Sequence, residues 1–306
     1  MSGCCSVEGR RILIARTIRT AAKSILGPQG IALVRRVRTL FSPASEYRAH
    51  LRSKKGLEIG GPSEMLADAG PLPVYEVLGS LDNCLYSGTT IWTGAVPDGT
   101  FFRYHPQKPP GTQIISDATD LHVIPNAAYQ CVISCHCLEH VANPLRALAE
   151  WKRVLTDDGV LLLILPHRDG TFDWRRQPTT LQHMIEDYER HTGEDDLTHL
   201  PEIVEFHDLT LDPGVGTVEQ FRQRSLANHM HRALHHHVFD TMAALKLVDY
   251  AGFQIVRIDN LKPCHIIILA SRAQGAIDNR LFLETGREHW RRSPFPSDHC
   301  YANVNG

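Results

Sequence analysis

Short apolar segments alternate with helical ones along this chain, and that alternation restricts its fold more than any other feature. Residues 130–134 and 160–165 are almost continuous apolar runs, the pattern of strands covered on both faces. Between them, Asn143 and Pro144 mark the start of a helix, because asparagine caps helices and proline suits their first position. The alternation predicts an α/β fold with a doubly wound, mostly parallel sheet, which we expect to have seven strands.

The pattern divides the 306 residues into an arm, a main domain and a tail. We expect a basic helical N-terminal arm over residues 1–50, a main domain over 51–275 with a helical insertion at 167–237, and a C-terminal tail over 276–306. Residues 1–55 contain twelve Lys and Arg but only two acids, whereas the rest of the chain contains 20 Lys and Arg and 32 acids. The arm and the body therefore carry opposite charge.

The remaining strands and helices of the main domain follow from shorter signals. Strands are predicted at residues 56–59, 74–78, 112–116, 253–258 and 265–270. Residues 79–112 are rich in Gly, Pro, Thr and Asn and are predicted to be mostly loop. One helix is predicted to begin at Pro62, and another to run from the cap Asp240 to the stop Gly252.

Residues 10–41 of the arm have apolar positions at helical spacing with arginines between them. Such an arm can lie on an anionic membrane surface or dock on the acidic body of its own chain, and the sequence leaves both open. No apolar run reaches the ~18 residues of a membrane-spanning helix. We therefore expect a cytoplasmic protein, with peripheral membrane contact through the arm as the alternative.

Three distinctive stretches follow predicted strands, where ligands bind in an open α/β sheet. They are Glu58 to Gly61, Asp117-Ala118, and Ser134 to His140. Cys135, His136, Cys137 and His140 in the third stretch are possible metal ligands, although half-buried, reduced cysteines are the simpler interpretation. We expect the three loops to form one pocket.

These stretches resemble the class I S-adenosylmethionine-dependent methyltransferases of the type 11-like group. The likeness covers roughly residues 55–166, and residues 238–270 fit the last helix and strand pair. It is carried by the Ser-x-x-x-Leu-Glu-His pattern from Ser134 to His140 and by Arg153-Val154-Leu155 at the end of the following helix. The resemblance implies a Rossmann-like fold, S-adenosyl-L-methionine as the cofactor, and methyltransferase activity.

The resemblance also implies roles for single residues. Gly60 and Gly61 would pass under the methionine part of the cofactor, with Glu58 helping to hold it. Asp117 and Ala118 would face the adenine. Ser134, Cys135 and His136 would line the floor of the site near the sulfonium. Either Glu76 or Asp82 would hold the ribose. Pro62 departs from the family's Gly-x-Gly-x-Gly loop, so cofactor binding is weakened or the loop takes another path. The absence of Gly-x-Gly-x-x-Gly disfavours a nicotinamide cofactor.

The acceptor is less constrained than the cofactor. We expect O-methylation of a saccharide or other small-molecule hydroxyl, because the acidic insertion would repel nucleic acid. The alternative is a catalytically inactive module of the same fold in cell-surface glycan assembly, associated with a membrane through its basic arm.

The sequence contains eighteen histidines, many of them in the insertion. The candidate bases are His136, His167 and His237, which all lie where ligand-facing loops should meet. The insertion is predicted to cover the cleft and to supply acceptor specificity. Acids and histidines of the insertion, such as Asp195 with His199, can hold a divalent cation. We prefer the interpretation that these histidines are solvated or structural, and we expect no metal. A metal-dependent hydrolase is disfavoured because no His-Glu-x-x-His occurs.

Overall fold

The computed structural model of the chain describes residues 44–90 and 94–303. Contacts divide the chain into two units, Met1–Ala49 and His50–Gly306. The helices predicted within residues 10–41 lie outside the described residues, and α2 (Ala44–Leu51) is the first element that is described. None of the helices within the described ranges is long and apolar enough to cross a membrane.

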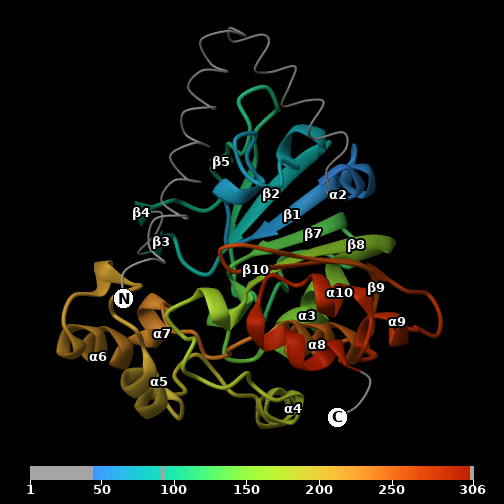
Figure 1. The fold of residues 1–306 in the computed structure, drawn as a ribbon. Coiled ribbons are helices and arrows are strands. Elements are labelled where there is room, and N and C mark those ends of the chain that lie inside the picture. The colour runs from blue at the N-terminus through green and yellow to red at the C-terminus, as the bar shows by residue number, and fades with distance from the viewer. Residues whose placement is uncertain (1–43, 91–93, 304–306) are drawn as a thin grey trace, which may run out of the picture. The chain divides into compact units, whose positions relative to one another are not determined.

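One large sheet forms the centre of the second unit, and the prediction of a mostly parallel α/β sheet is confirmed (Figure 1). In the described residues its eight strands lie in the order β5 (Phe101–Phe102), β6 (Gly111–Ile115), β2 (Ser80–Leu85), β1 (Lys55–Ile59), β7 (Tyr129–Cys135), β8 (Leu155–Pro166), β10 (His265–Arg272) and β9 (Phe253–Leu261). The five strands from β6 to β8 are parallel, and β10 is antiparallel to both of its neighbours. The eighth strand, beyond the seven predicted, is the two-residue edge strand β5, which is antiparallel to β6. A separate two-stranded ribbon pairs β3 (Thr89–Thr90) with β4 (Gly94–Ala95).

The two long helices predicted from capping signals are present. In α3 (Pro144–Val154) the Asn143 side chain accepts a hydrogen bond from the Arg146 amide at 3.1 Å. In α8 (Thr241–Tyr250) the Asp240 side chain accepts from the Ala243 amide at 2.7 Å. Both helices pack against the sheet in one apolar cluster, in which Trp151 and Leu245 are fully buried. The caps and the apolar faces therefore place the helices as the sequence predicts.

The order in which strands are added to the sheet reverses direction at β1, because β2 lies on one side of β1 and β7 on the other. Right-handed crossovers that run in opposite directions along a parallel sheet lie on opposite faces of that sheet. The crossover from β1 to β2 therefore covers one face, and α3, between β7 and β8, covers the other. The reversal leaves a crevice at the carboxyl ends of β1 and β7, where ligands bind in folds of this class.

The crossover from β1 to β2 differs from the prediction. Residues 74–78 do not form a strand, because η2 (Tyr75–Val77) is a 3-10 helix and β2 follows it inside the segment predicted to be loop. The polar residues Asp82 and Asn83 interrupt the apolar pattern of β2, so its sequence does not resemble a buried strand. No α-helix begins at Pro62 either: the Gly61–Pro62 peptide is cis, and the 3-10 helix η1 (Glu64–Leu66) follows it.

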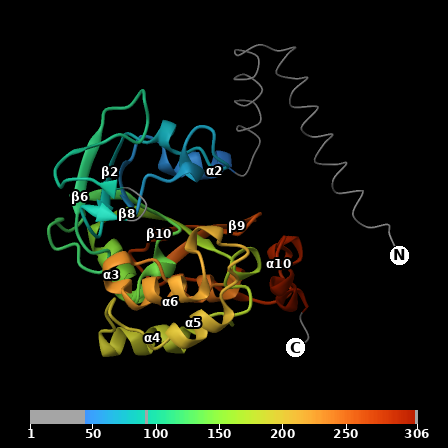
Figure 2. The same ribbon diagram turned by 90° about the vertical axis from the view of Figure 1, so that its left-hand side faces the viewer.

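The insertion is helical and gathers on one side of the unit (Figures 1 and 2). It contains η4 (Arg168–Gly170), α4 (Leu181–Arg190), α5 (Leu200–Phe206), η5 (Pro213–Val215), α6 (Val218–Leu226) and α7 (Asn228–His231). A small apolar cluster of its own, including Ile203 and Phe221, holds α5 and α6 together. The insertion thus has local packing and also reaches the crevice through its loops.

The C-terminal segment packs on the main domain through α9 (Arg280–Leu283), α10 (Glu288–Arg292) and η6 (Pro296–Ala302). Trp290 is fully buried in the same apolar cluster as α3 and α8, and its indole nitrogen donates to the Glu284 carbonyl at 2.8 Å. Asp298 is also fully buried. The tail is therefore part of the folded core.

Candidate functional site

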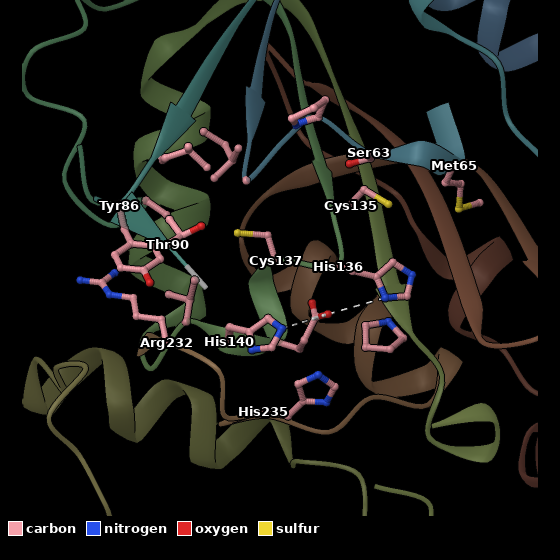
Figure 3. Close-up of a pocket in the computed structure, with 18 of the residues that line it drawn as sticks. Ser63, Met65, Tyr86, Thr90, Cys135, His136, Cys137, His140, Arg232 and His235 are labelled. Atoms are coloured by element: carbon pink, nitrogen blue, oxygen red, sulfur yellow. Dashed lines mark ion pairs between the residues drawn. The ribbon is translucent and has the colours of Figure 1, made fainter. Parts of the chain in front are cut away.

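A cavity of about 670 Å³ opens at the carboxyl ends of the parallel strands (Figure 3). It is lined by residues from each of the three loops singled out in the sequence, including Gly60 after β1, Ala118 after β6 and His136 after β7. The insertion adds Phe172, Arg232 and His235 to the wall. Its volume falls within the range of about 300–1,000 Å³ that is typical of small-molecule sites.

The loop after β1 is held from beneath by Glu58. This carboxylate is fully buried and accepts hydrogen bonds from the Ser63 hydroxyl at 2.8 Å and from the Tyr75 hydroxyl at 2.8 and 2.9 Å. Burial raises the pKa of Glu58 to about 7. Glu58 does not line the cavity, so in this structure it positions the loop that does.

Both glycines of this loop are required by their surroundings. Gly60 has a φ of +85° and lines the cavity, a conformation that favours glycine. A Cβ atom on Gly61 would overlap the carboxyl group of Glu58. The Gly61 amide donates to the Asn83 side chain at 3.0 Å, and that side chain donates back to the Gly61 carbonyl at 3.0 Å. The sequence analysis missed Asn83, because the sequence does not show that its side chain pairs with Gly61.

Neither candidate for the ribose site lies at the cavity. Asp82 lies in the middle of β2, where it accepts from the Thr112 amide at 2.7 Å and the Tyr129 hydroxyl at 2.9 Å. Glu76 is exposed on η2, in the crossover that precedes β2. At the end of β2 the cavity is lined instead by Leu85 and Tyr86, and Glu64 lines it from the neighbouring loop. Glu64 is the carboxylate of this loop that the structure brings to the cavity.

The loop after β6 is divided between two cavities. Ser116 and Ala118 line the large one, whereas Asp117 lines a second cavity of about 330 Å³. Asp117 accepts a hydrogen bond from Arg232 of the insertion at 2.6 Å, and Arg232 also lies over the Tyr86 ring at 4.8 Å. The side chain predicted to face adenine is thus engaged by an arginine that lines both cavities.

His136 projects from the end of β7 into the cavity and has a φ of +50°, which is uncommon for a residue other than glycine. Its amide donates to the Ile164 carbonyl of β8 at 2.9 Å, and its Nε2 lies 2.8 Å from His265 Nδ1. Its Nδ1 lies 3.7 Å from Glu139 Oε1. Burial, and next the neighbouring His265, lower its pKa to about 3, so the ring is neutral. Of the other predicted floor residues, Cys135 lines the cavity and Ser134 is fully buried behind it.

The wall beside His136 is a polar cluster that we call the Glu139 cluster, formed by Glu139, His140 and His235 (Figure 3). Glu139 is 1% exposed, and burial raises the pKa of its carboxyl to about 7. Asp173 accepts a hydrogen bond from His235 Nδ1. The sequence analysis missed Glu139 and His235 as a pair, because 96 positions separate them and the insertion brings them together.

The structure does not bring His167 or His237 to the cavity wall. His167 is fully buried, and its Nε2 donates to Asp298 at 3.2 Å. His237 is also buried, and its Nε2 donates to the Ala142 carbonyl at 3.2 Å. His167 directly follows β8 and His237 lies four residues before α8, and packing turns their rings away from the crevice. We therefore keep His136 alone of the three predicted bases.

One segment of the chain matches a known protein family. Residues 97–163 match a family model described as a methyltransferase domain, and this segment contains β6, β7, α3 and most of β8. A search of curated protein sequences gives no match.

The solved structures that this chain resembles are distant from it in sequence. A SAM-dependent methyltransferase from Methanosarcina mazei is 15% identical with a TM-score of 0.42, over 77% of this chain and 99% of that one. The 1,6-didemethyltoxoflavin-N1-methyltransferase of Burkholderia thailandensis is 11% identical with a TM-score of 0.41, over 90% and 94%. A SAM-dependent methyltransferase from Aquifex aeolicus is 10% identical with a TM-score of 0.38, over 83% and 98%.

Proposed function

We propose that this chain is a class I S-adenosylmethionine-dependent methyltransferase that methylates a hydroxyl group of a small polyhydroxylated acceptor, of which a saccharide is the expected class. The methyltransferase-domain match over residues 97–163 and the mostly parallel sheet support the first part of the proposal. The observation that carries the proposal is the composition of the cavity wall. The strand-end loops and the insertion both line the cavity, and they meet in the Glu139 cluster, to which the loop after β7 contributes Glu139 and His140 and the insertion contributes His235.

The strand-end part of the cavity fits the cofactor. The backbone at Gly60 lets a ligand approach closely, which suits the methionine portion. Ser116 and Ala118 lie where the adenine is expected, with the apolar side chain of Leu85 nearby on the wall. Glu64 and Tyr86 are the polar groups positioned for the ribose hydroxyls. These assignments replace Glu76 and Asp82 and keep Gly60 and Ala118.

The cofactor supplies a methyl group that is already activated on a sulfonium. The protein must align the acceptor oxygen with that methyl group and remove the acceptor proton, and such alignment contributes about 7–11 kcal/mol. The acceptor oxygen forms its bond to carbon as the carbon–sulfur bond breaks, with the electron pair staying on sulfur. His136 Nδ1 accepts the hydroxyl proton. The tautomer in which its Nε2 donates to His265 leaves Nδ1 with the lone pair that this step requires.

The insertion provides the acceptor part of the wall. Thr171, Phe172 and Leu211 line the cavity together with His235, so the insertion closes the site on the side away from the strand-end loops. Hydroxyl, imidazole and carboxylate groups at this density suit an acceptor with several hydroxyls, because each buried polar group needs a partner. Nucleic acid is a poorer fit, since the insertion contains many acids.

Two measurements test the proposal. Isothermal titration should show binding of S-adenosylmethionine, and a transfer assay with labelled cofactor should show incorporation into monosaccharides, oligosaccharides or other polyols. Binding without transfer to any hydroxyl acceptor, but with transfer to amines or thiols, would overturn the acceptor class. No cofactor binding at millimolar concentration would favour the inactive module, and vesicle flotation with and without residues 1–50 would then test its membrane contact.

A further inference from the structure

The Glu139 cluster has the composition of a metal site. One carboxylate oxygen of Glu139 and one ring nitrogen each of His140 and His235 lie within 4.8 Å of one another. Glu139 Oε1 lies 3.9 Å from His140 Nε2, and the two imidazole rings meet edge to face with centroids 4.6 Å apart. Ligand atoms around a tetrahedral zinc ion lie about 3.3 Å apart, so small side-chain rotations complete the geometry.

Hydrogen bonds at the far side of each imidazole fix its orientation. His140 Nδ1 donates to the Leu234 carbonyl at 3.0 Å, because a carbonyl oxygen can only accept. His235 Nδ1 donates in the same way to the Asp173 carboxylate. When each ring is in its neutral form, its lone pair is therefore on Nε2. Metal-binding histidines characteristically make this bond to a carbonyl or carboxylate with the nitrogen that does not bind the metal.

The Glu139 carboxylate is the second observation. It is almost completely buried, and its Oε2 has no hydrogen-bond partner among the described residues. An unpaired carboxylate oxygen in a buried site is costly unless a cation or a donor satisfies it. The buried Arg176 is occupied elsewhere: it donates to the His235 carbonyl at 2.8 Å and pairs with Glu202 at 2.8 Å and with Asp173 at 3.4 Å. Among the described residues, no arginine or lysine is an ion-pair partner of Glu139.

We propose that Glu139, His140 and His235 bind one divalent transition-metal ion, with Asp173 as the outer carboxylate that positions His235. Two imidazoles with one carboxylate favour zinc and related first-row ions over magnesium or calcium, which prefer all-oxygen sites. All three ligands line the cavity, so the remaining coordination positions face the space of the acceptor. Three protein ligands with an open position are typical of catalytic metal sites.

The role of the ion rests on the proposed function, whereas its binding does not. An ion held by these three residues would supply a positive charge that lowers the pKa of the acceptor hydroxyl. His136, whose Nδ1 lies 3.7 Å from Glu139 Oε1, would then accept the proton.

The test uses zinc with the full-length protein and measures binding directly. After treatment with a chelator, titration with Zn²⁺ and elemental analysis should give one ion per chain. Glu139→Gln and His235→Ala should each weaken zinc binding at least tenfold, and Asp173→Asn should weaken it about 10–100-fold. His183→Ala is the matched control, because His183 pairs with His199 and Asp187 in the insertion, outside the cavity wall. This variant should keep full binding.

A second measurement covers variants that fail to fold. Cobalt(II) added to the wild-type protein should give a visible absorption band of a site with nitrogen and oxygen ligands, and one equivalent of zinc should abolish it. Wild-type protein that binds no stoichiometric zinc would overturn the proposal. Folded Glu139→Gln and His235→Ala that bind zinc like the wild type, or loss of zinc in His183→Ala alone, would overturn it as well. Stoichiometric zinc without methyl transfer would leave the metal site standing and overturn the proposed function instead.

Discussion

Arg232 Nη2 donates to Asp117 Oδ2 across 2.6 Å, and this ion pair joins the insertion to the loop after β6. The two residues are 115 positions apart, and Arg232 adopts a φ of +48° to reach its partner. The cavity wall on this side therefore depends on a contact between the two parts of the domain. Loss of the contact should loosen the insertion without disturbing the sheet.

Arg232→Gln should lower the free energy of unfolding by about 1 kcal/mol at pH 7, since the pair is partly exposed and screened by solvent. Burial acts to raise the pKa of Asp117, but the hydrogen bond from Arg232 holds it below its ordinary value of 3.8. The stabilisation is therefore present above about pH 4 and is lost as the pH falls through the lowered pKa. Urea unfolding of the wild type and of Arg232→Gln at pH 7 and pH 3 measures the size of the stabilisation and its loss at low pH. Arg190→Gln, which breaks an exposed pair with Glu186, is the control and should change stability little.

His136→Gln should lower kcat by a factor of about 10²–10⁴ while leaving cofactor affinity within a few-fold, because the side chain accepts the acceptor's proton. Transfer of label from the cofactor, together with isothermal titration, separates the two effects. His122→Gln is the matched control, since His122 is exposed and pairs with Asp120 away from the cavity. Equal turnover in the wild type and in His136→Gln would remove His136 as the base.

Glu58→Gln should change how stability depends on pH. Burial raises the pKa of Glu58 to about 7 in the folded protein, from 4.5 for an ordinary glutamate. Folding therefore favours the protonated form, and its stabilisation is complete below about pH 4.5 and disappears as the pH rises through 7. As the pH rises from 4.5 to 7, the free energy of unfolding of Glu58→Gln should therefore increase by roughly 3 kcal/mol relative to that of the wild type. Denaturant unfolding at several pH values gives the difference curve, and a flat one would contradict the raised pKa. The exposed Glu219→Gln is the control variant for the same measurement.

Asp298→Ala should cost about 3 kcal/mol, because it removes the partner of several buried donors at once. Asp298 accepts from His167 at 3.2 Å, and from the hydroxyls of Thr241 and Ser293 at 2.6 Å each. Thermal or urea unfolding measures the loss. Asp278→Ala removes an exposed carboxylate and should cost far less. Similar effects of the two substitutions would show that the C-terminal segment does not stabilise the core.

The elements with strong local signals were predictable. The strand at β7, the capped helices α3 and α8 and the apolar core of β8 agree with their predictions, because each has a continuous apolar pattern or a capping residue. β2 escaped prediction because Asp82 and Asn83 are satisfied by partners elsewhere in the sheet, and a sequence does not show those partners. The same reason hides Asn83 as a support of the glycine loop.

The same distinction between local signals and long-range contacts applies to the candidate site. Gly60, Ala118, Cys135 and His136 line one cavity because they lie at the carboxyl ends of β1, β6 and β7, which are parallel strands of one sheet. Strand order is a property of the whole fold. His167 and His237 also lie next to strands or helices, yet packing against Asp298 and Ala142 turns them away. Position along the chain fixes which loop carries a residue, whereas side-chain packing fixes where its ring points.

The sequence by itself determined the α/β class, the strand-end loops and the family resemblance, because these depend on local periodicity, capping residues and short motifs. Only the tertiary structure decided which acids and histidines meet. Glu139 and His235 contact the same cavity although 96 residues separate them, and Asp173 reaches His235 across 62. Such contacts depend on how the insertion folds back over the sheet, and that path is set by the sum of many packing interactions.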